Sequence, residues 1–395
     1  MIKSFTVKNY KALRDVTVEL TPVHVLIGPN DAGKTSFLEA VAALSSSVDR
    51  DVVHGFPGRW KGTDLLWARD VNNRVVFQVT IEDGHGTISY QLGLAFWPSD
   101  GKRVETLPVG DDYSERIILN GDVVQANRAG QRSWICSLHA APSDEQTPRS
   151  NRVFQALSGH QLYRWVPKHL AMPVAPANQP PFQLWPSGFG LVHCLDDILD
   201  DDRDRFVQLE KEFVEYFPEM KKIILRREPA LAGRHDPFDE LTLSEAPGKG
   251  LYFELKGGGL IPASQVSDGV LIILAYLSIL HIPQPPRILM IEEPENGIHP
   301  KRLKEVVKIL KGLVKTHQHT QVILTTHSPY LLDHFAPAEV TVFKKEADGS
   351  VSTHKLSNSK AVKEQRKLFT LGEIWSGEGE ERLARNVAQS GAKRR

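Results

Sequence analysis

Alternating apolar and polar positions mark the start of the chain. Residues 2–20 alternate through two short runs separated by a polar turn at 8–11, which predicts a β-hairpin. The apolar run 23–27 follows and is typical of a buried strand, and residues 36–44 then place apolar side chains at helical spacing. We therefore predict a strand, a glycine-rich turn and a helix directly after the hairpin.

The middle of the chain has a different pattern. Residues 75–81 and 88–94 read as two strands on either side of the turn-rich segment 82–86, which indicates an antiparallel β lobe within residues 50–150. Many prolines and small residues in 166–188 predict an extended connection. Helices are expected at about 189–199 and 203–216, and strands return from Ile223.

The last third alternates strand and helix patterns. An apolar helix at 271–280 precedes a strand at 287–291, a helix at 301–314, a strand at 321–325 and a helix start at 329–334. This alternation favours an α/β fold with a mixed sheet flanked by helices. We expect core segments at 1–50 and 261–395, a β-rich lobe with an insertion at 51–185, and a helical subdomain with return strands at 186–260.

Composition excludes several classes. Lysine plus arginine equals aspartate plus glutamate at 48 each, so any nucleic-acid contact must come from a local patch. Cys136 and Cys194 are far apart, which argues against a disulfide framework or a zinc site. We find no run of about eighteen apolar residues and no apolar core of a signal peptide, so we expect a cytoplasmic protein.

A phosphate-binding loop is predicted directly after the strand 23–27. Residues 28–35 fit the pattern G-x-x-x-x-G-K-[ST] between a strand and a helix, a context that favours this reading over a chance glycine-rich turn. Lys34 should reach the β- and γ-phosphates of ATP, and Thr35 should place its hydroxyl on Mg²⁺. The candidate ATP-binding residues here are Gly28, Asn30, Asp31, Ala32, Gly33, Lys34, Thr35 and Ser36.

Three further motifs carry candidate chemistry. The strand 287–291 ends in paired acids, and alternation would give them different faces: Glu292 would bind Mg²⁺ through water, and Glu293 would orient or deprotonate the attacking water. His327 follows the strand 321–325 and could donate to a γ-phosphate oxygen or to that water. Ser267, Asp268 and Gly269 precede the helix 271–280, where they could hold a phosphate or simply cap the helix.

The order of these four motifs resembles that of ABC-type ATPases, and in particular the RecF, SMC and OLD branch. The resemblance is carried by IKSFTVKNYKALRDVTVEL (2–20), GPNDAGKTSFLEA (28–40), PSGFGLVHCLDDI (186–198), IEEPENGIHP (291–300), TTHSPYLLD (325–333) and LGEIWSGEGEE (371–381). It implies an ABC-type ATPase head with an antiparallel β lobe and a helical subdomain, and ATP and Mg²⁺ as cofactors. The glutamine of the family's metal-sensing loop has no secure assignment.

The resemblance also implies an ATP-sandwich homodimer. Ser267 and Gly269 of one copy would contact the γ-phosphate bound by the other copy, and residues 295–299 would line the interface. The signature is VSDGV where transporters have LSGGQ, so the Asp268 side chain must point away from the phosphates.

The function expected from this resemblance is ATP hydrolysis in a dimerising switch. It would control a separately encoded effector, a nuclease or toxin in anti-phage defence, because residues 328–395 contain no Asp-x-Asp of a Toprim nuclease domain. The alternative is a RecF-like DNA-binding ATPase of repair or replication, for which the best basic cluster is Lys221, Lys222, Arg226, Arg227, Arg234 and His235. A solvated face is the simpler explanation of that cluster, and a transporter subunit is disfavoured by the paired acids and the missing LSGGQ.

Overall fold

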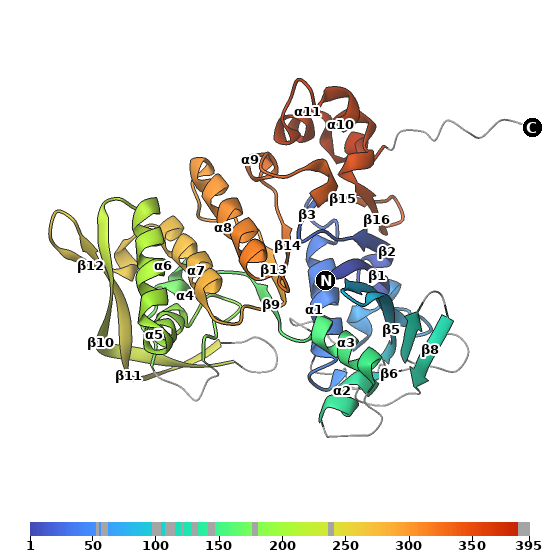
Figure 1. The fold of residues 1–395 in the computed structure, drawn as a ribbon. Coiled ribbons are helices and arrows are strands. Elements are labelled where there is room, and N and C mark those ends of the chain that lie inside the picture. The colour runs from blue at the N-terminus through green and yellow to red at the C-terminus, as the bar shows by residue number, and fades with distance from the viewer. Residues whose placement is uncertain are drawn as a thin grey trace, which may run out of the picture. The chain divides into compact units, whose positions relative to one another are not determined.

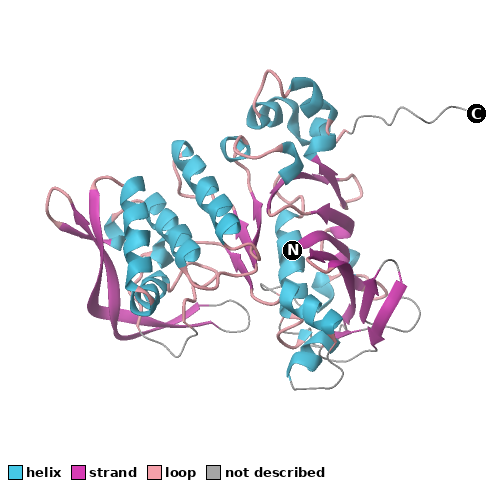
Figure 2. Ribbon diagram, in the orientation of Figure 1, coloured by secondary structure: helices cyan, strands magenta, loops and turns pink. Residues whose placement is uncertain are grey.

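The computed structural model describes residues 1–52, 55–56, 62–96, 104–106, 115–119, 122–127, 133–140, 147–175, 181–235 and 241–385. The chain divides into two compact units. The first combines residues Met1–His160 with Gln321–Arg395, and the second comprises Gln161–Thr320. Both units mix helices and strands (Figures 1 and 2). In the described ranges no helix combines the length and the hydropathy needed to cross a membrane.

A largely parallel sheet forms the centre of the first unit. Strand β3 (Val23–Ile27) lies between β14 (Gln321–Thr325) and β15 (Val340–Lys345) and is parallel to both, while β16 (Val351–Lys355) is antiparallel to β15. All five residues of β3 are buried, as its continuous apolar run predicts for a strand covered on both faces. Helix α1 (Lys34–Ser46) follows β3, and the predicted strand, turn and helix are confirmed.

An antiparallel sheet completes the first unit. Its order is β2-β1-β4-β5-β7-β8, with β6 (Val104–Thr106) paired to β5. The bounds are β1 Ile2–Tyr10, β2 Leu13–Glu19, β4 Val75–Asp83, β5 Gly86–Phe96, β7 Glu115–Leu119 and β8 Asp122–Asn127. The hairpin and the antiparallel pair were predicted as separate features, but Phe5 of β1 pairs with Val79 of β4, so they form one sheet.

Short helices accompany these sheets in the first unit. Helices α2 (Trp134–Ala140) and α3 (Pro148–Leu157) follow the antiparallel strands along the chain. After β14 come α9 (Pro329–Leu332), α10 (Lys360–Gln365) and α11 (Leu371–Leu383), the last interrupted at Gly379. Part of the predicted β-lobe segment, and the chain beyond Arg385, lie outside the described residues.

The second unit packs helices beside a long hairpin. Helices α5 (Leu191–Asp201), α6 (Arg203–Tyr216), α7 (Asp268–His281) and α8 (Leu303–Thr316) match the predicted helices within a few residues. Strand β13 (Ile288–Glu292) neighbours β9 (His160–Tyr163), which begins at the unit boundary. The connection predicted as extended contains one helical turn, α4 (Pro167–Leu170), because Pro167 suits a first helical position.

The hairpin of β10 (Met220–His235) and β11 (Leu241–Leu255) pairs with β12 (Leu260–Pro262) and is crossed by residues 173–175. Val174 exchanges two backbone hydrogen bonds with Lys249, at 2.8 and 2.9 Å. A Cβ at Gly248 would lie 2.3 Å from the Val174 carbonyl oxygen, so only glycine admits this crossing.

Candidate functional site

The predicted phosphate loop has the backbone geometry of an anion-binding turn. Gly28, Asp31 and Gly33 have φ angles of 146°, 64° and 84°, and Gly33 is the N-cap of α1. Left-handed residues at a helix start let successive backbone N–H groups converge on one point, where the helix dipole also favours negative charge. The loop is therefore suited to phosphate.

Gly28 also sets the position of the loop against the sheet. A Cβ on Gly28 would lie 2.3 Å from the carbonyl oxygen of Phe343 in β15, far below any contact that a real Cβ makes. Its positive φ adds strain for any other residue. The first glycine of the motif is therefore required by packing as well as by ligand approach.

Lys34 folds back over the loop. The residue is only 6% exposed, and its Nζ donates hydrogen bonds of 2.8 Å to the carbonyl oxygens of Gly28 and Pro29. Asp31 forms an ion pair with Lys345 of β15, while Thr35 is exposed at the start of α1. Of the remaining predicted loop residues, Asn30 is exposed, Ala32 is buried and Ser36 is half-buried.

His327 lies at the same edge of the parallel sheet as this loop. Leu26 of β3 pairs with Thr325 of β14, and the two strands run parallel, so Gly28 and His327 each follow their paired residues by two positions. Thr326 is fully buried, and its Oγ1 accepts a 2.9 Å hydrogen bond from the Ser328 N–H, which fixes the turn that carries His327. The first unit therefore brings the phosphate loop and the strand-end histidine together.

The paired acids lie in the second unit and differ in backbone conformation. Glu292 is the last residue of β13, whose first four residues are buried. Glu293 has φ 47°, so it has already left the strand. The expectation that strand alternation places the two acids on opposite faces is therefore wrong, because alternation applies only to extended residues. The Asn296 amide instead donates a 2.7 Å hydrogen bond to Glu293 Oε2 and orients that carboxylate.

The start of α7 packs against the segment that follows the acids. Ser267 is the N-cap, and its hydroxyl makes no capping hydrogen bond in the described structure. Asp268 lies against Gly297, since a Cβ added to Gly297 would be 3.0 Å from the Asp268 Cβ. A Cβ added to Gly269 would be 3.4 Å from the Gly297 carbonyl oxygen. The second unit therefore brings together the predicted signature residues and the acid-tipped strand.

One residue of the site is not apparent from the sequence pattern. Arg164 follows β9, and its guanidinium forms an ion pair with both carboxylate oxygens of Glu292. A single arginine after a strand carries no local signal of function. Only the pairing of β9 beside β13 reveals the contact.

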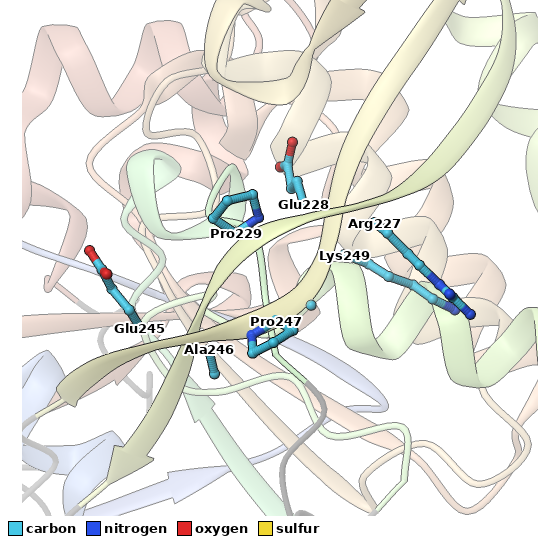
Figure 3. Close-up of a pocket in the computed structure, with 8 residues that line it drawn as sticks. Arg227, Glu228, Pro229, Glu245, Ala246, Pro247 and Lys249 are labelled. Carbon is cyan, nitrogen blue, oxygen red and sulfur yellow. The ribbon is translucent and has the colours of Figure 1, made fainter.

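The basic cluster considered for DNA lies on β10. Lys221 pairs with Glu254, and the Arg226 guanidinium lies 5.7 Å from the centre of the Tyr252 ring. Arg227 is exposed opposite Lys249 in the hairpin, beside a hollow that the strands line (Figure 3). The side chains of Arg234 and His235 lie outside the described part of the chain. Within the described part of this cluster, Glu254 therefore offsets the charge of Lys221.

Two domain families match this sequence. The family described as "AAA domain, putative AbiEii toxin, Type IV TA system" matches residues 183–333, and the family "AAA ATPase domain" matches residues 1–88. The first match contains the signature residues, the paired acids and His327, and the second contains the phosphate loop. Both sets of candidate residues therefore fall inside ATPase domain matches.

A curated relative and two solved structures are similar to the chain. An OLD nuclease from Thermus scotoductus is 44% identical over 48 residues, which is 12% of this chain and only 9% of the nuclease. An Smc head bound to the C-winged helix domain of ScpA has a TM-score of 0.51 at 14% identity, covering 89% of this chain and 97% of that one. The SMC head domain from Thermotoga maritima covers 90% and 98% at 13% identity, with a TM-score of 0.46.

These findings agree with the geometry of both units. The mixed α/β fold is similar to that of the Smc head, and the family matches cover the phosphate loop and the motifs behind it. Residues 1–88 and 183–333 thus match AAA-type ATPase domain families, and a 48-residue stretch is similar to an OLD nuclease.

Proposed function

We propose that this protein binds ATP with Mg²⁺ at Gly28–Ser36 and hydrolyses it to ADP and phosphate. The observation that carries this proposal is the buried Lys34 ammonium folded over a loop of left-handed residues at a helix N-terminus. The ammonium donates hydrogen bonds of 2.8 Å to the backbone carbonyls of Gly28 and Pro29, which hold it over the loop. A triphosphate bound there would contact both the ammonium and the converging N–H groups.

The remaining site residues fit the parts that ATP hydrolysis requires. Thr35 presents an exposed hydroxyl oxygen, which is a ligand type that Mg²⁺ accepts. The Glu292 carboxylate already binds a cation, the Arg164 guanidinium. Mg²⁺, when bound, neutralises charge on the β- and γ-phosphate oxygens. In this proposal Glu293, oriented by Asn296, accepts the proton of the attacking water, and His327 donates a hydrogen bond to a γ-phosphate oxygen.

Phosphate release by the purified full chain tests this activity. We expect phosphate release by the parent protein to require Mg²⁺ and to stop when EDTA is added, and we expect Glu292→Gln to release no phosphate. ATP should also raise the melting temperature of the parent. A parent protein that neither releases phosphate nor gains thermal stability from ATP would refute the proposal.

We propose further that hydrolysis takes place in a dimer of two copies. Ser267 and Asp268 are exposed at the start of α7, and the Ser267 hydroxyl does not cap the helix within the described structure. This hydroxyl can therefore donate a hydrogen bond to a phosphate of the ATP bound by a second copy. Light scattering should show a dimer with a non-hydrolysable ATP analogue. Ser267→Arg should remain monomeric while keeping analogue affinity, and an unchanged dimer in that variant would contradict the arrangement.

The dimer would act as a switch on a separately encoded effector in anti-phage defence. Support comes from the matched family description, which names a toxin of a toxin–antitoxin system, and from the similar OLD nuclease. Co-expression with the products of neighbouring genes, followed by affinity capture with ATP or with ADP, tests this role in the cytoplasm. Nucleotide-independent capture, or no protection of cells against phage, would contradict it.

DNA binding is the second candidate, favoured by exposed Lys222 and Arg227 on β10. A DNA-binding ATPase should bind duplex DNA with an affinity that falls steeply with salt, because phosphate contacts release counterions. Arg226→Ala combined with Arg227→Ala should abolish this binding and any stimulation of ATP hydrolysis. Salt-insensitive or absent binding by the parent would reject this candidate.

A further inference from the structure

The Arg164 guanidinium contacts the Glu292 carboxylate through two nitrogen atoms. Its Nε contacts Glu292 Oε2, and its Nη2 donates to Glu292 Oε1 at 3.2 Å. The Glu292 side chain is 16% exposed and that of Arg164 is 42% exposed. Two-point binding of this kind fixes the geometry of the carboxylate and occupies one face of both oxygens. A guanidinium therefore holds the carboxylate that the proposed activity assigns to a metal ion.

The backbone around Arg164 is anchored on both sides. The Arg164 N–H donates to the Pro186 carbonyl at 2.9 Å, and the Val166 N–H donates to the Ser187 carbonyl at the same distance. The main chain is therefore fixed next to a long side chain that is 42% exposed. A change in the Arg164 side-chain rotamer would break neither backbone hydrogen bond.

Trp165 connects this segment to the helix that carries the signature residues. Its ring packs on Tyr163 at 5.2 Å and on Tyr276 of α7 at 4.5 Å between ring centres. Among the described residues, the Trp165 indole N–H and the Tyr276 hydroxyl are buried and lack hydrogen-bond partners. No hydrogen bond therefore locks this contact, and the indole is well placed to report a change at its neighbour.

The ion pair is open to solvent on the arginine side. Because the Arg164 side chain is 42% exposed, water and salt screen part of an attraction that the two-point contact strengthens. A dication attracts the same carboxylate more strongly than a guanidinium does, and the two cations repel one another when both approach it. Arg164 and a metal ion cannot both keep their best geometry at Glu292.

We propose that Arg164 is a positioning residue that competes with Mg²⁺ for Glu292. This inference rests on the proposed role of Glu292 in metal binding. In the nucleotide-free chain the guanidinium neutralises and aims the carboxylate, and arrival of the metal with ATP displaces it. The displacement changes the packing of Trp165 against Tyr276. Arg164 thereby sets the Mg²⁺ concentration at which the site becomes loaded.

Mg²⁺ titrations of the full chain with a fluorescent, non-hydrolysable ATP analogue test this competition. Arg164→Met keeps the length of the side chain and removes the charge, so its Mg²⁺ midpoint should fall about fivefold below that of the parent. Arg164→Lys keeps the positive charge but loses the two-nitrogen contact of the guanidinium, so its Mg²⁺ midpoint should lie between those of Arg164→Met and the parent. Tryptophan fluorescence should change with Mg²⁺ in the parent, and Trp165→Phe should remove that change.

A matched control comes from a similar ion pair elsewhere. Arg152 forms two 2.8 Å hydrogen bonds with the carboxylate of Asp83, a pair that contains no predicted site residue. Arg152→Met should leave the Mg²⁺ midpoint unchanged. An unchanged or higher midpoint in Arg164→Met, with analogue binding intact, overturns the competition alone. Analogue binding that is independent of Mg²⁺ in the parent overturns the metal role of Glu292 and the competition with it.

Discussion

Replacing Lys34 by methionine should separate stability from nucleotide binding. Each hydrogen bond from the Lys34 ammonium to the carbonyls of Gly28 and Pro29 is charge-assisted and contributes about 1.5–3 kcal/mol. Burying the ammonium in a position only 6% exposed costs several kcal/mol, on the order of the same sum. Methionine fills a similar volume without that cost. We therefore expect the free energy of unfolding without nucleotide to change by about 1 kcal/mol or less.

The affinity for ATP should respond very differently. Loss of the ammonium removes a charged hydrogen bond to phosphate, which is about 1.5–3 kcal/mol or roughly a 10- to 150-fold loss of affinity. Thermal unfolding measures both effects, because ATP at about 100 times its dissociation constant adds about 2.7 kcal/mol to the parent. At that concentration ATP should stabilise Lys34→Met by only about 0.3–1.4 kcal/mol, so half or more of the shift in melting temperature should be gone.

Lys304 supplies the control for the loss of a lysine, since it is exposed on α8. Lys304→Met should keep the full ATP-dependent shift. A loss of more than about 3 kcal/mol in Lys34→Met without nucleotide would show that the hydrogen bonds of the ammonium outweigh its burial cost, and would refute this prediction. The prediction also fails if the variant keeps the parent's ATP shift.

The remaining predictions concern turnover, backbone geometry and pH. Glu293→Gln should bind ATP and form a stable dimer with little phosphate release, and release at the parent rate would exclude Glu293 as the base. Gly297→Ala should lower stability by about 1–3 kcal/mol, because φ is 77° and the new Cβ would meet neighbours at 3.0–3.1 Å. Gly312→Ala, in an open position of α8, should instead raise stability by about 0.5–1 kcal/mol, and urea unfolding compares the two. Burial, and then the Lys355 charge, lower the pKa of His24 to about 3, so the unfolded chain takes up its proton first. Stability should therefore fall as pH drops from about 6.5 toward 3, by up to about 1.4 kcal/mol per unit, and an equally steep fall in His24→Gln would contradict this cause.

Local patterns carried most of the fold prediction. Strands β3 and β14 were predicted because each is a short buried apolar run bounded by turn residues, and α6 because Phe206, Leu209 and Phe213 recur at helical spacing. The sequence did not reveal which strands pair with one another. The contact between Phe5 and Val79 joins the hairpin to the β lobe, and periodicity does not say which strand lies beside which. Helix α4 was missed because a single turn is shorter than one helical repeat pattern.

In the candidate site, too, the local features could be predicted from the sequence and the long-range contacts could not. The loop from Gly28 to Ser36 could be predicted because strand, glycines and helix are adjacent in the sequence. The left-handed conformation of Glu293 could not, because that conformation is uncommon for a non-glycine residue and is imposed by its surroundings. Arg164 contacts Glu292 across 128 positions of sequence, and no local pattern encodes such a distance.

The position of β3 in its sheet has a consequence for biosynthesis. Val25 pairs with Leu324 on one side and with Val340 on the other, and the Ile2 backbone is bonded by the Gln321 side chain. At about 5–20 residues per second, a ribosome needs on the order of 15–60 s between emergence of the phosphate loop and emergence of its strand neighbours. During this interval β3 exposes an apolar strand with two unpaired edges, which is a template for aggregation. A nascent chain halted before Gln321 should therefore need a chaperone and should fail to bind ATP.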